Sequence, residues 1–176
     1  MSDGLDLKGE TRFEKSHRNG LSATSCLNLI RYQRPENSEY FGQNKHTDNG
    51  SLTLLLTEQL GLQVLSRESQ QWENVLPPPG HAVVNVADTL RFLSGKTFRS
   101  AVHRVIPHFA PDQTHRFSVG YFLRAEDEAL VKDNDGNVIT ARQWHDRKYV
   151  NYVQTHDVQK TNSILLGGME VQEIAT

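Results

Sequence analysis

Short extended segments separated by turn residues fill the middle of this 176-residue chain and constrain its fold more than any other feature. Residues 51–57 form an almost continuous apolar run, and residues 60–65 alternate between apolar and polar, so both are expected to be strands of a buried sheet. Pro77-Pro78-Pro79-Gly80 is a strong break before the next segment. Further strands are expected at residues 27–32, 81–86, 100–107 and 116–123.

One helix is expected late in the chain, after a turn at Asn134-Asp135-Gly136. Thr140 is a good N-cap for a helix over residues 141–152, because its hydroxyl can accept from the first free backbone N–H groups. Trp144, Lys148 and Tyr152 then lie along one stripe of that helix. Many short strands with one late helix predict a mainly β fold, an antiparallel barrel or jelly roll.

The chain divides into three predicted parts. Residues 1–25 are polar and lack a helical or alternating period, so they are expected to be a flexible or loosely packed arm. Residues 26–124 carry the strands and form the β core, and residues 125–176 supply a turn, the helix and a tail.

Charge and cysteine content exclude several classes of function. The chain has 19 Lys and Arg against 21 Asp and Glu, a formal net charge of −2, which argues against binding nucleic acid or an anionic membrane. A single cysteine rules out an intrachain disulfide and a Cys-based metal cluster. No apolar run is long enough for a membrane span and no signal peptide is recognisable, so we expect a cytoplasmic protein. Its chemistry must come from His, carboxylates, Arg and hydroxyls.

The triplet His46-Thr47-Asp48 is the first candidate for that chemistry. In an extended segment, residues two apart project from the same face, so the imidazole and the carboxylate can converge on one point. Taken alone, such a triplet is more often an ordinary surface feature. His103, 55 residues after Asp48 on another expected strand, supplies a third group. Two His and one carboxylate are the facial triad that holds Fe(II), whereas a lone strand histidine is more often satisfied by a neighbouring carbonyl.

Arg116-Phe117-Ser118 presents a guanidinium and a hydroxyl on one face of a strand. Together they can bind a small-molecule carboxylate, because Arg grips it with two parallel hydrogen bonds and Ser adds a directional donor. An Arg paired with an acidic residue on a barrel rim is the alternative. The order His-x-Asp, then His, then Arg-x-Ser, all on expected strands, is much harder to obtain by accident than any one of the three.

These motifs resemble a known family, the non-haem Fe(II), 2-oxoglutarate-dependent dioxygenases of the isopenicillin N synthase-like group. The resemblance covers residues 26–149, and Trp144-His145-Asp146-Arg147-Lys148-Tyr149 is similar to the C-terminal helix of fungal members. Its other segments are His46-Thr47-Asp48-Asn49-Gly50-Ser51-Leu52-Thr53-Leu54-Leu55, Gly61-Leu62-Gln63-Val64, Trp72, Pro79-Gly80, Asn85-Val86-Ala87-Asp88, Ser100-Ala101-Val102-His103-Arg104-Val105, Arg116-Phe117-Ser118 and Tyr121-Phe122.

The resemblance implies a double-stranded β-helix, a jelly roll whose two sheets enclose the metal. It implies that His46, Asp48 and His103 are the iron ligands. Arg116 and Ser118 would bind the distal carboxylate of 2-oxoglutarate, and Tyr32 matches a tyrosine on the first core strand that often reaches the co-substrate or substrate.

The implied cofactors are Fe(II), 2-oxoglutarate and O₂, and the implied partner is a small organic molecule of secondary metabolism. That molecule would be hydroxylated, desaturated or cyclised, with release of succinate and CO₂. Two alternatives stay open. Some oxidases of the group, such as isopenicillin N synthase, use the Arg-x-Ser pair for a substrate carboxylate and need no 2-oxoglutarate, and a truncated non-catalytic remnant would keep the motifs without activity.

Two departures from the family pattern bear on these expectations. Ala87 replaces the usual Gly of the Asn-Val-Gly-Asp motif, a modest change if the backbone φ there is negative. The chain also lacks the long N-terminal region that usually covers the barrel, so a missing segment or a partner is expected to cover an apolar barrel face.

Overall fold

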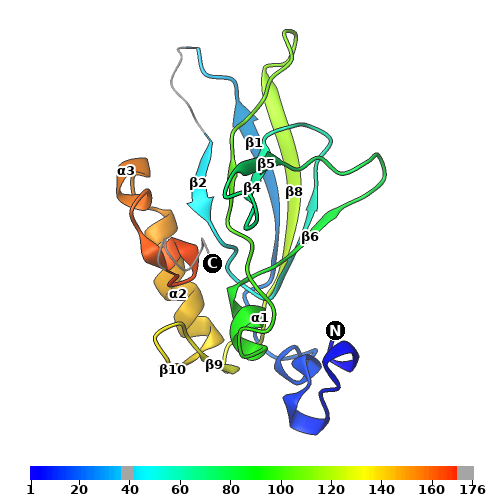
Figure 1. The fold of residues 1–176 in the computed structure, drawn as a ribbon, viewed down its shortest axis with the longest axis vertical. Helices are drawn as coiled ribbons and strands as arrows, with labels where there is room; N and C mark the ends of the chain where they lie inside the picture. The colour runs from blue at the N-terminus through cyan, green and yellow to red at the C-terminus, as the bar shows by residue number, and fades with distance from the viewer. Residues whose placement is uncertain (37–41, 170–176) are drawn as a thin grey trace.

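The computed structural model describes residues 1–36 and 42–169, and these form a mainly β protein (Figure 1). The strands are β1 (Cys26–Gln33), β2 (Gln43–His46), β3 (Leu52–Leu56), β4 (Leu62–Leu65), β5 (Trp72–Asn74), β6 (Val83–Val86), β7 (His103–Val105), β8 (His115–Leu123), β9 (Leu130–Lys132) and β10 (Val138–Thr140). The helices are α1 (Asp88–Leu93), α2 (Ala141–Tyr152) and α3 (His156–Gln159). Short 3-10 turns lie at η1 (Asp3–Leu5), η2 (Gly9–Thr11), η3 (Phe13–Ser16) and η4 (Ser163–Leu166).

Two antiparallel four-stranded sheets make the core of the molecule. One sheet has the order β1-β8-β3-β6 and the other has the order β2-β7-β4-β5. Side chains from both sheets line one shared cavity, so the sheets face each other as the two layers of a jelly roll. The mainly β fold expected from the sequence is therefore confirmed.

The six strands expected from the sequence correspond to β1, β3, β4, β6, β7 and β8, with small changes at their ends. The expected strand at 100–107 is shorter, because only His103–Val105 pairs with its neighbours. Helix α1 follows Ala87 directly. Ala87 has φ −105°, in the ordinary extended region, so its methyl group replaces the usual glycine without backbone strain.

Helix α2 begins where the sequence predicts. The Thr140 hydroxyl accepts from the Gln143 backbone N–H at 3.1 Å, and the Gln143 side-chain carbonyl accepts from the Thr140 N–H at 2.9 Å, which completes a capping box. The predicted stripe of α2, which contains Trp144, packs against the protein. Trp144 is 1% exposed, and its ring contacts Phe92 edge-on. The sequence missed the β9–β10 hairpin, although it predicts the turn between the two strands.

Residues 1–25 contain the turns η1 to η3 and contact the core in several places. His17 lies 2.7 Å from the Ser51 hydroxyl, and Arg18 pairs with Glu126. The three-part division at 25/26 and 124/125 stays a prediction, and residues 170–176 of its last part lie outside the described residues. Among the helices of ranges 1–36 and 42–169, none has the length and apolar character that a bilayer crossing requires.

Candidate metal centre and carboxylate pocket

Three predicted side chains converge where β2 ends and β7 begins. His46 is the last residue of β2, His103 is the first of β7, and these two are cross-strand partners. Asp48 lies two residues beyond β2, in a loop and not on a strand as the sequence pattern suggested. Its Oδ1 is 3.7 Å from Nε2 of His46 and 3.5 Å from Nε2 of His103. One ligand atom from each residue therefore lies within 4.8 Å of the others, close enough for one metal ion.

Backbone carbonyls fix the orientation of both imidazoles. Nδ1–H of His46 donates to the Asn44 carbonyl at 2.7 Å, and Nδ1–H of His103 donates to the Ala101 carbonyl at 3.0 Å. A carbonyl oxygen can only accept, so Nδ1 carries the proton in each ring and Nε2 keeps its lone pair for a metal. Both free nitrogens face Asp48.

Burial and mutual charge set the protonation of the three groups. Burial together with the nearby His103 lowers the pKa of His46 to about 3. Burial would raise the pKa of Asp48, but the two adjacent imidazoles hold it far below its usual value. Burial acts to lower the pKa of His103, and the Asp48 carboxylate outweighs it and raises that pKa. Without a metal, the site is thus a carboxylate paired with a readily protonated His103 and a neutral His46.

Asn85, whose role could not be predicted from the sequence, contacts the candidate metal centre. Its Nδ2 donates to Oδ2 of Asp48 at 2.8 Å, which leaves Oδ1 directed at the two histidines. Outer partners of this kind orient a ligating carboxylate and tune its affinity for metal. The sequence signal for Asn85 was its position in the Asn-Val-Ala-Asp motif. The motif alone does not show its contact with Asp48, because that contact depends on the pairing of β6 with β3, the strand that follows the Asp48 loop.

The arginine predicted to bind a carboxylate lies in the same interior. Arg116 is 1% exposed, and its Nε donates to the Leu60 carbonyl at 2.8 Å. Gly61 makes room for it: a Cβ at Gly61 would lie 2.8 Å from both Arg116 Nε and the Ile106 carbonyl oxygen, and its φ of +138° also favours glycine. Nη1 of Arg116 is buried and has no hydrogen-bond partner among the described residues. An unsatisfied buried guanidinium N–H is well suited to a carboxylate ligand.

The other two predicted binding residues lie near Arg116: Tyr32 through the pairing of β1 with β8, and Ser118 two residues further along β8. Tyr32 is the cross-strand partner of Arg116, and its ring centre lies 5.3 Å from the guanidinium carbon. Ile30 is the partner of Ser118 in the same way. Burial raises the pKa of the Tyr32 phenol, although the Arg116 cation opposes that effect.

A small cavity of about 60 Å³ joins the metal site to the carboxylate pocket. Asp48 and His103 line it together with Tyr32, Arg116 and Ser118. The structure therefore brings the predicted site residues together, with His46 at the edge of the cavity through its contacts with Asp48 and His103. The remaining lining is mostly apolar: Ile30, Leu55, Leu62, Val64, Val83, Ala101, Val105 and Phe122.

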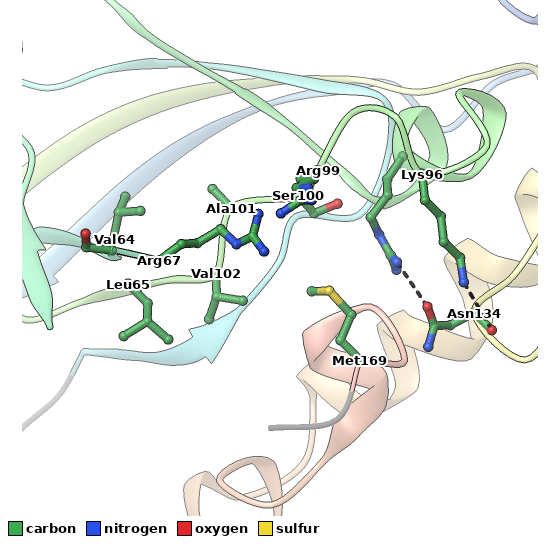
Figure 2. A pocket seen from close by; sticks show the side chains of 12 residues that line it. Val64, Leu65, Arg67, Lys96, Arg99, Ser100, Ala101, Val102, Asn134 and Met169 are labelled. Carbon is green, nitrogen blue, oxygen red and sulfur yellow. Dashed lines mark hydrogen bonds between the residues drawn. The ribbon is translucent and has the colours of Figure 1, made fainter. Parts of the chain in front are cut away.

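A larger hollow of about 630 Å³ lies beside the site and contains none of the triad (Figure 2). It shares Val64 and Ala101 with the smaller cavity. Its walls are basic, with Arg67, Lys96 and Arg99 around it, and Lys96 reaches the Asn134 carbonyl at 3.4 Å. The predicted chemistry is assigned to the smaller of these two cavities, because five of the six predicted site residues line it and none lines the larger one.

Comparison with known proteins assigns the family. Residues 23–125 match the model of the 2OG-Fe(II) oxygenase superfamily, and this range contains the six predicted site residues. The chain belongs to that superfamily. It is 50% identical over 173 residues to the 2-oxoglutarate-dependent dioxygenase iboH of Amanita muscaria, a match covering 97% of this chain and 84% of that protein.

Most relatives of this oxygenase chain are longer. It is 46% identical to the 2-oxoglutarate-dependent dioxygenase FG08081 of Gibberella zeae and 44% identical to gloE of Glarea lozoyensis, both named as dioxygenases of the same kind. These matches cover 100% and 97% of this chain but only 53% and 52% of the relatives. The chain thus spans about half the length of several curated relatives that it matches.

Solved structures support the fold of the oxygenase core. The structure of JOX2 in complex with 2OG, Fe and JA matches with a TM-score of 0.68 at 24% identity, covering 91% of this chain and 49% of that one. A full-length Neurospora crassa protein in complex with alpha-KG matches with a TM-score of 0.66 at 24% identity, covering 85% and 50%. At this identity the likeness bears on the fold alone, and it supports the jelly roll expected from the sequence.

Proposed function

We propose that the protein is a non-haem Fe(II), 2-oxoglutarate-dependent oxygenase that oxidises a small organic molecule of secondary metabolism. The observation that carries the proposal is a cavity lined both by Asp48 and His103 of the 2-His-1-carboxylate cluster and by Arg116, whose buried Nη1 has no hydrogen-bond partner among the described residues. The family to which the chain belongs and the names of its fungal relatives support the same activity.

In this proposal His46, Asp48 and His103 hold Fe(II). Two imidazoles and one carboxylate on one side of the ion are the donor set of non-haem Fe(II) oxygenases, and they leave coordination positions open. The neutral His46, the ionised Asp48 and the two Nε2 atoms freed for coordination suit this set. His103 gives up its proton when the metal binds.

Arg116 and Ser118 bind the distal carboxylate of 2-oxoglutarate, and Tyr32 packs against that end of the co-substrate. The Leu60 carbonyl holds Nε of Arg116, and Nη1, which has no hydrogen-bond partner among the described residues, is left for the carboxylate. When bound, iron with 2-oxoglutarate and O₂ supplies the oxidising power, and succinate and CO₂ are the by-products. The protein's own part is to orient the co-substrate and to exclude water with the apolar lining.

We also propose that a further segment of the protein, or a partner, covers the outer face of the sheet β1-β8-β3-β6. Leu27, Tyr121, Leu54 and Val84 are successive cross-strand partners across all four strands, and each is exposed by 41% or more. A continuous apolar row of this kind is typical of a covered surface. We further propose that the protein acts in the cytoplasm.

An anaerobic titration tests the assignment. The purified chain is titrated with Fe(II) and then with 2-oxoglutarate, and the visible charge-transfer band of chelated co-substrate is followed. Wild type is expected to form the band. Arg116→Ala is expected to weaken 2-oxoglutarate binding about 30-fold or more while iron binding is retained, because a buried charged partner is lost. Arg142→Gln, which removes an exposed arginine of α2, serves as the control and is expected to behave like wild type.

Each other outcome points to one of the alternatives. Iron binding without the band, together with O₂ consumption that does not need 2-oxoglutarate, identifies an oxidase of the isopenicillin N synthase type. A folded chain that binds no iron is a non-catalytic remnant. The substrate and the choice between hydroxylation, desaturation and ring closure are then sought by product analysis.

A further inference from the structure

We propose that helix α2 is part of the metal centre, because its buried side chains Lys148 and Tyr152 fix the backbone between the ligands His46 and Asp48. Both are positioning residues in this proposal, since neither is a ligand. The inference rests on the proposed iron site and assigns it a second layer of residues, 101 and 105 positions away from Thr47 in the sequence.

Thr47, the residue between the two ligands, is the point of attachment. Its backbone N–H donates to the Leu165 carbonyl at 2.9 Å. Its carbonyl accepts from the Tyr152 hydroxyl at 2.8 Å, and its Oγ1 accepts from Lys148 Nζ at 2.7 Å. The amide, the carbonyl and the hydroxyl of Thr47 are therefore all bound by α2 or by η4, and Thr47 is fully buried.

Lys148 is itself held in place by a buried ion pair. It is fully buried, and Nζ forms an ion pair with the carboxylate of Asp88, which is also fully buried. Asp88 opens α1, and its backbone N–H donates to the Asp48 carbonyl at 3.1 Å. The Lys148 ammonium group thus links helix α2, the start of α1 and the loop that carries Asp48. Breaking a buried pair of this kind by removing one partner is costly, so the linkage is rigid.

Tyr152 also contacts a ligand directly. Its ring meets the His46 ring edge-on, with the centres 5.6 Å apart. Asn49, the residue after Asp48, donates from its side chain to the His145 carbonyl of α2 at 3.1 Å. Asn44, whose carbonyl orients His46, donates its own amide to the His156 carbonyl at 2.9 Å. The C-terminal region therefore holds the ligand loop at both ends and in the middle.

The physical consequence is preorganisation of the metal site. A loop that is free to move must be ordered when the metal binds, and that cost lowers the metal affinity. A loop already fixed by buried hydrogen bonds avoids the cost. Loss of one outer partner of a ligand typically reduces metal affinity or activity about 10- to 100-fold.

The test measures Fe(II) affinity by anaerobic titration calorimetry on Tyr152→Phe, which keeps the ring and removes only the hydroxyl. We expect Fe(II) to bind about tenfold more weakly than in wild type, with KM for 2-oxoglutarate unchanged in the iron-saturated protein. Tyr149→Phe is the matched control, because Tyr149 lies on the same helix with its side chain exposed. It is expected to leave both quantities unchanged.

Lys148 is tested by a charge-neutral pair of substitutions. Lys148→Met alone leaves the Asp88 carboxylate unpaired in the interior and threatens folding, so it is combined with Asp88→Asn. We expect the double variant to fold and to bind Fe(II) about tenfold more weakly or worse. Adding Thr47→Val to Tyr152→Phe should cost less affinity than the two separate losses summed, because both act on the same residue.

A merely structural role for α2 gives a different pattern. In that case Tyr152→Phe and the double variant lower Tm of the metal-free protein but bind Fe(II) as wild type does below that Tm, and the inference is overturned. Loss of iron binding by Tyr149→Phe to the same extent also overturns it. If wild type itself binds no iron, the proposed function fails and this inference fails with it.

Discussion

The two faces of the sheet β1-β8-β3-β6 differ in chemistry: the inner face sets polar and charged side chains among apolar ones, whereas a row across all four strands of the outer face is apolar and exposed. The inner face presents Arg116, Ser118, Thr53 and Asn85, all buried or half-buried. The outer face presents a row of leucine, valine and tyrosine side chains to solvent, with Leu29 78% exposed. An antiparallel sheet with one solvated face normally has the reverse arrangement.

The difference between the faces follows from what each must do. The inner face lines the proposed site for a charged co-substrate and a metal. Its buried polar groups are stable there where they have a partner or can bind a ligand: Asn85 donates to Asp48, and Nη1 of Arg116 is left for a carboxylate. The outer face has apolar side chains because it is suited to burial against another structure. Arg116 and Phe117 are neighbours in sequence, yet one is 1% exposed and the other 56%. Successive side chains of a strand point to opposite faces of the sheet, so β8 can supply Arg116 to the cavity and Phe117 to the outer face.

The largest expected effect concerns the metal ligands of the inner region. His46→Ala or Asp48→Ala is expected to abolish Fe(II)-dependent turnover, because two remaining ligands cannot hold the ion in an open site. Turnover is measured as succinate formed from 2-oxoglutarate. His81→Ala removes an exposed histidine outside the site and is expected to retain full activity. Retained turnover in either ligand variant would sink the triad assignment.

Acidity is expected to weaken iron binding through His103. Its pKa is raised by Asp48, so His103 takes up a proton as pH falls through that pKa, and iron must displace this proton. His46 is neutral, since its pKa is about 3, and Asp48 is ionised, so neither contributes a proton near neutral pH. Below the His103 pKa we expect about one proton released per iron bound and iron affinity falling about tenfold per pH unit, and above that pKa we expect neither. Calorimetry in buffers of different ionisation enthalpy measures the proton count.

The stability of the metal-free protein depends on pH in the opposite direction from iron affinity. A raised His103 pKa contributes stability that is fully present below the unfolded-state pKa and is lost as pH rises through the folded-state value. The rise in Tm caused by saturating Fe(II) should therefore be larger at about pH 8 than at about pH 6. An equal rise at both values contradicts the assignment.

Gly61→Ala tests the support of the inner-face arginine. The added methyl group meets Arg116 Nε and a backbone oxygen at 2.8 Å in a left-handed conformation, so we expect a loss of about 1–3 kcal/mol in free energy of unfolding. KM for 2-oxoglutarate should rise about tenfold, because Arg116 is displaced. Gly80→Ala is the matched control: it also has positive φ, but its methyl group would enter open space. It is expected to lose stability without a change in KM.

The smallest effect is expected on the outer face. Leu29→Gln and Ile30→Gln change adjacent residues of β1 that point to opposite sides of the sheet. Leu29→Gln should alter the free energy of unfolding by about 0.5 kcal/mol or less and reduce self-association, as seen by light scattering. Ile30→Gln should cost about 1–3 kcal/mol, because Ile30 lines the cavity. Equal losses from the two would show that the outer face is already covered in this chain.

Much of the fold could be read from local patterns. The alternation in residues 60–65, the break at Pro77-Pro78-Pro79-Gly80 and the cap at Thr140 each depend on neighbours in sequence, and the strands and helix follow them. The hairpin β9–β10 was missed because three-residue strands are too short to show a period. Gly61 was visible only as a motif residue, since its purpose depends on Arg116 of a distant strand.

The candidate site divides in the same way. The sequence by itself determined which residue types recur at spacings suited to a facial triad and a carboxylate pocket, because spacing of two along an extended chain fixes a shared face. Only the tertiary structure decided that His46, Asp48 and His103 meet, that Asn85 holds Asp48, and that Lys148 and Tyr152 fix the loop between the ligands. The hydrogen bonds that Asn85, Lys148 and Tyr152 make to this loop join positions 37 to 105 apart in the sequence. They are strong because they are buried, and burial is not specified by any local sequence pattern.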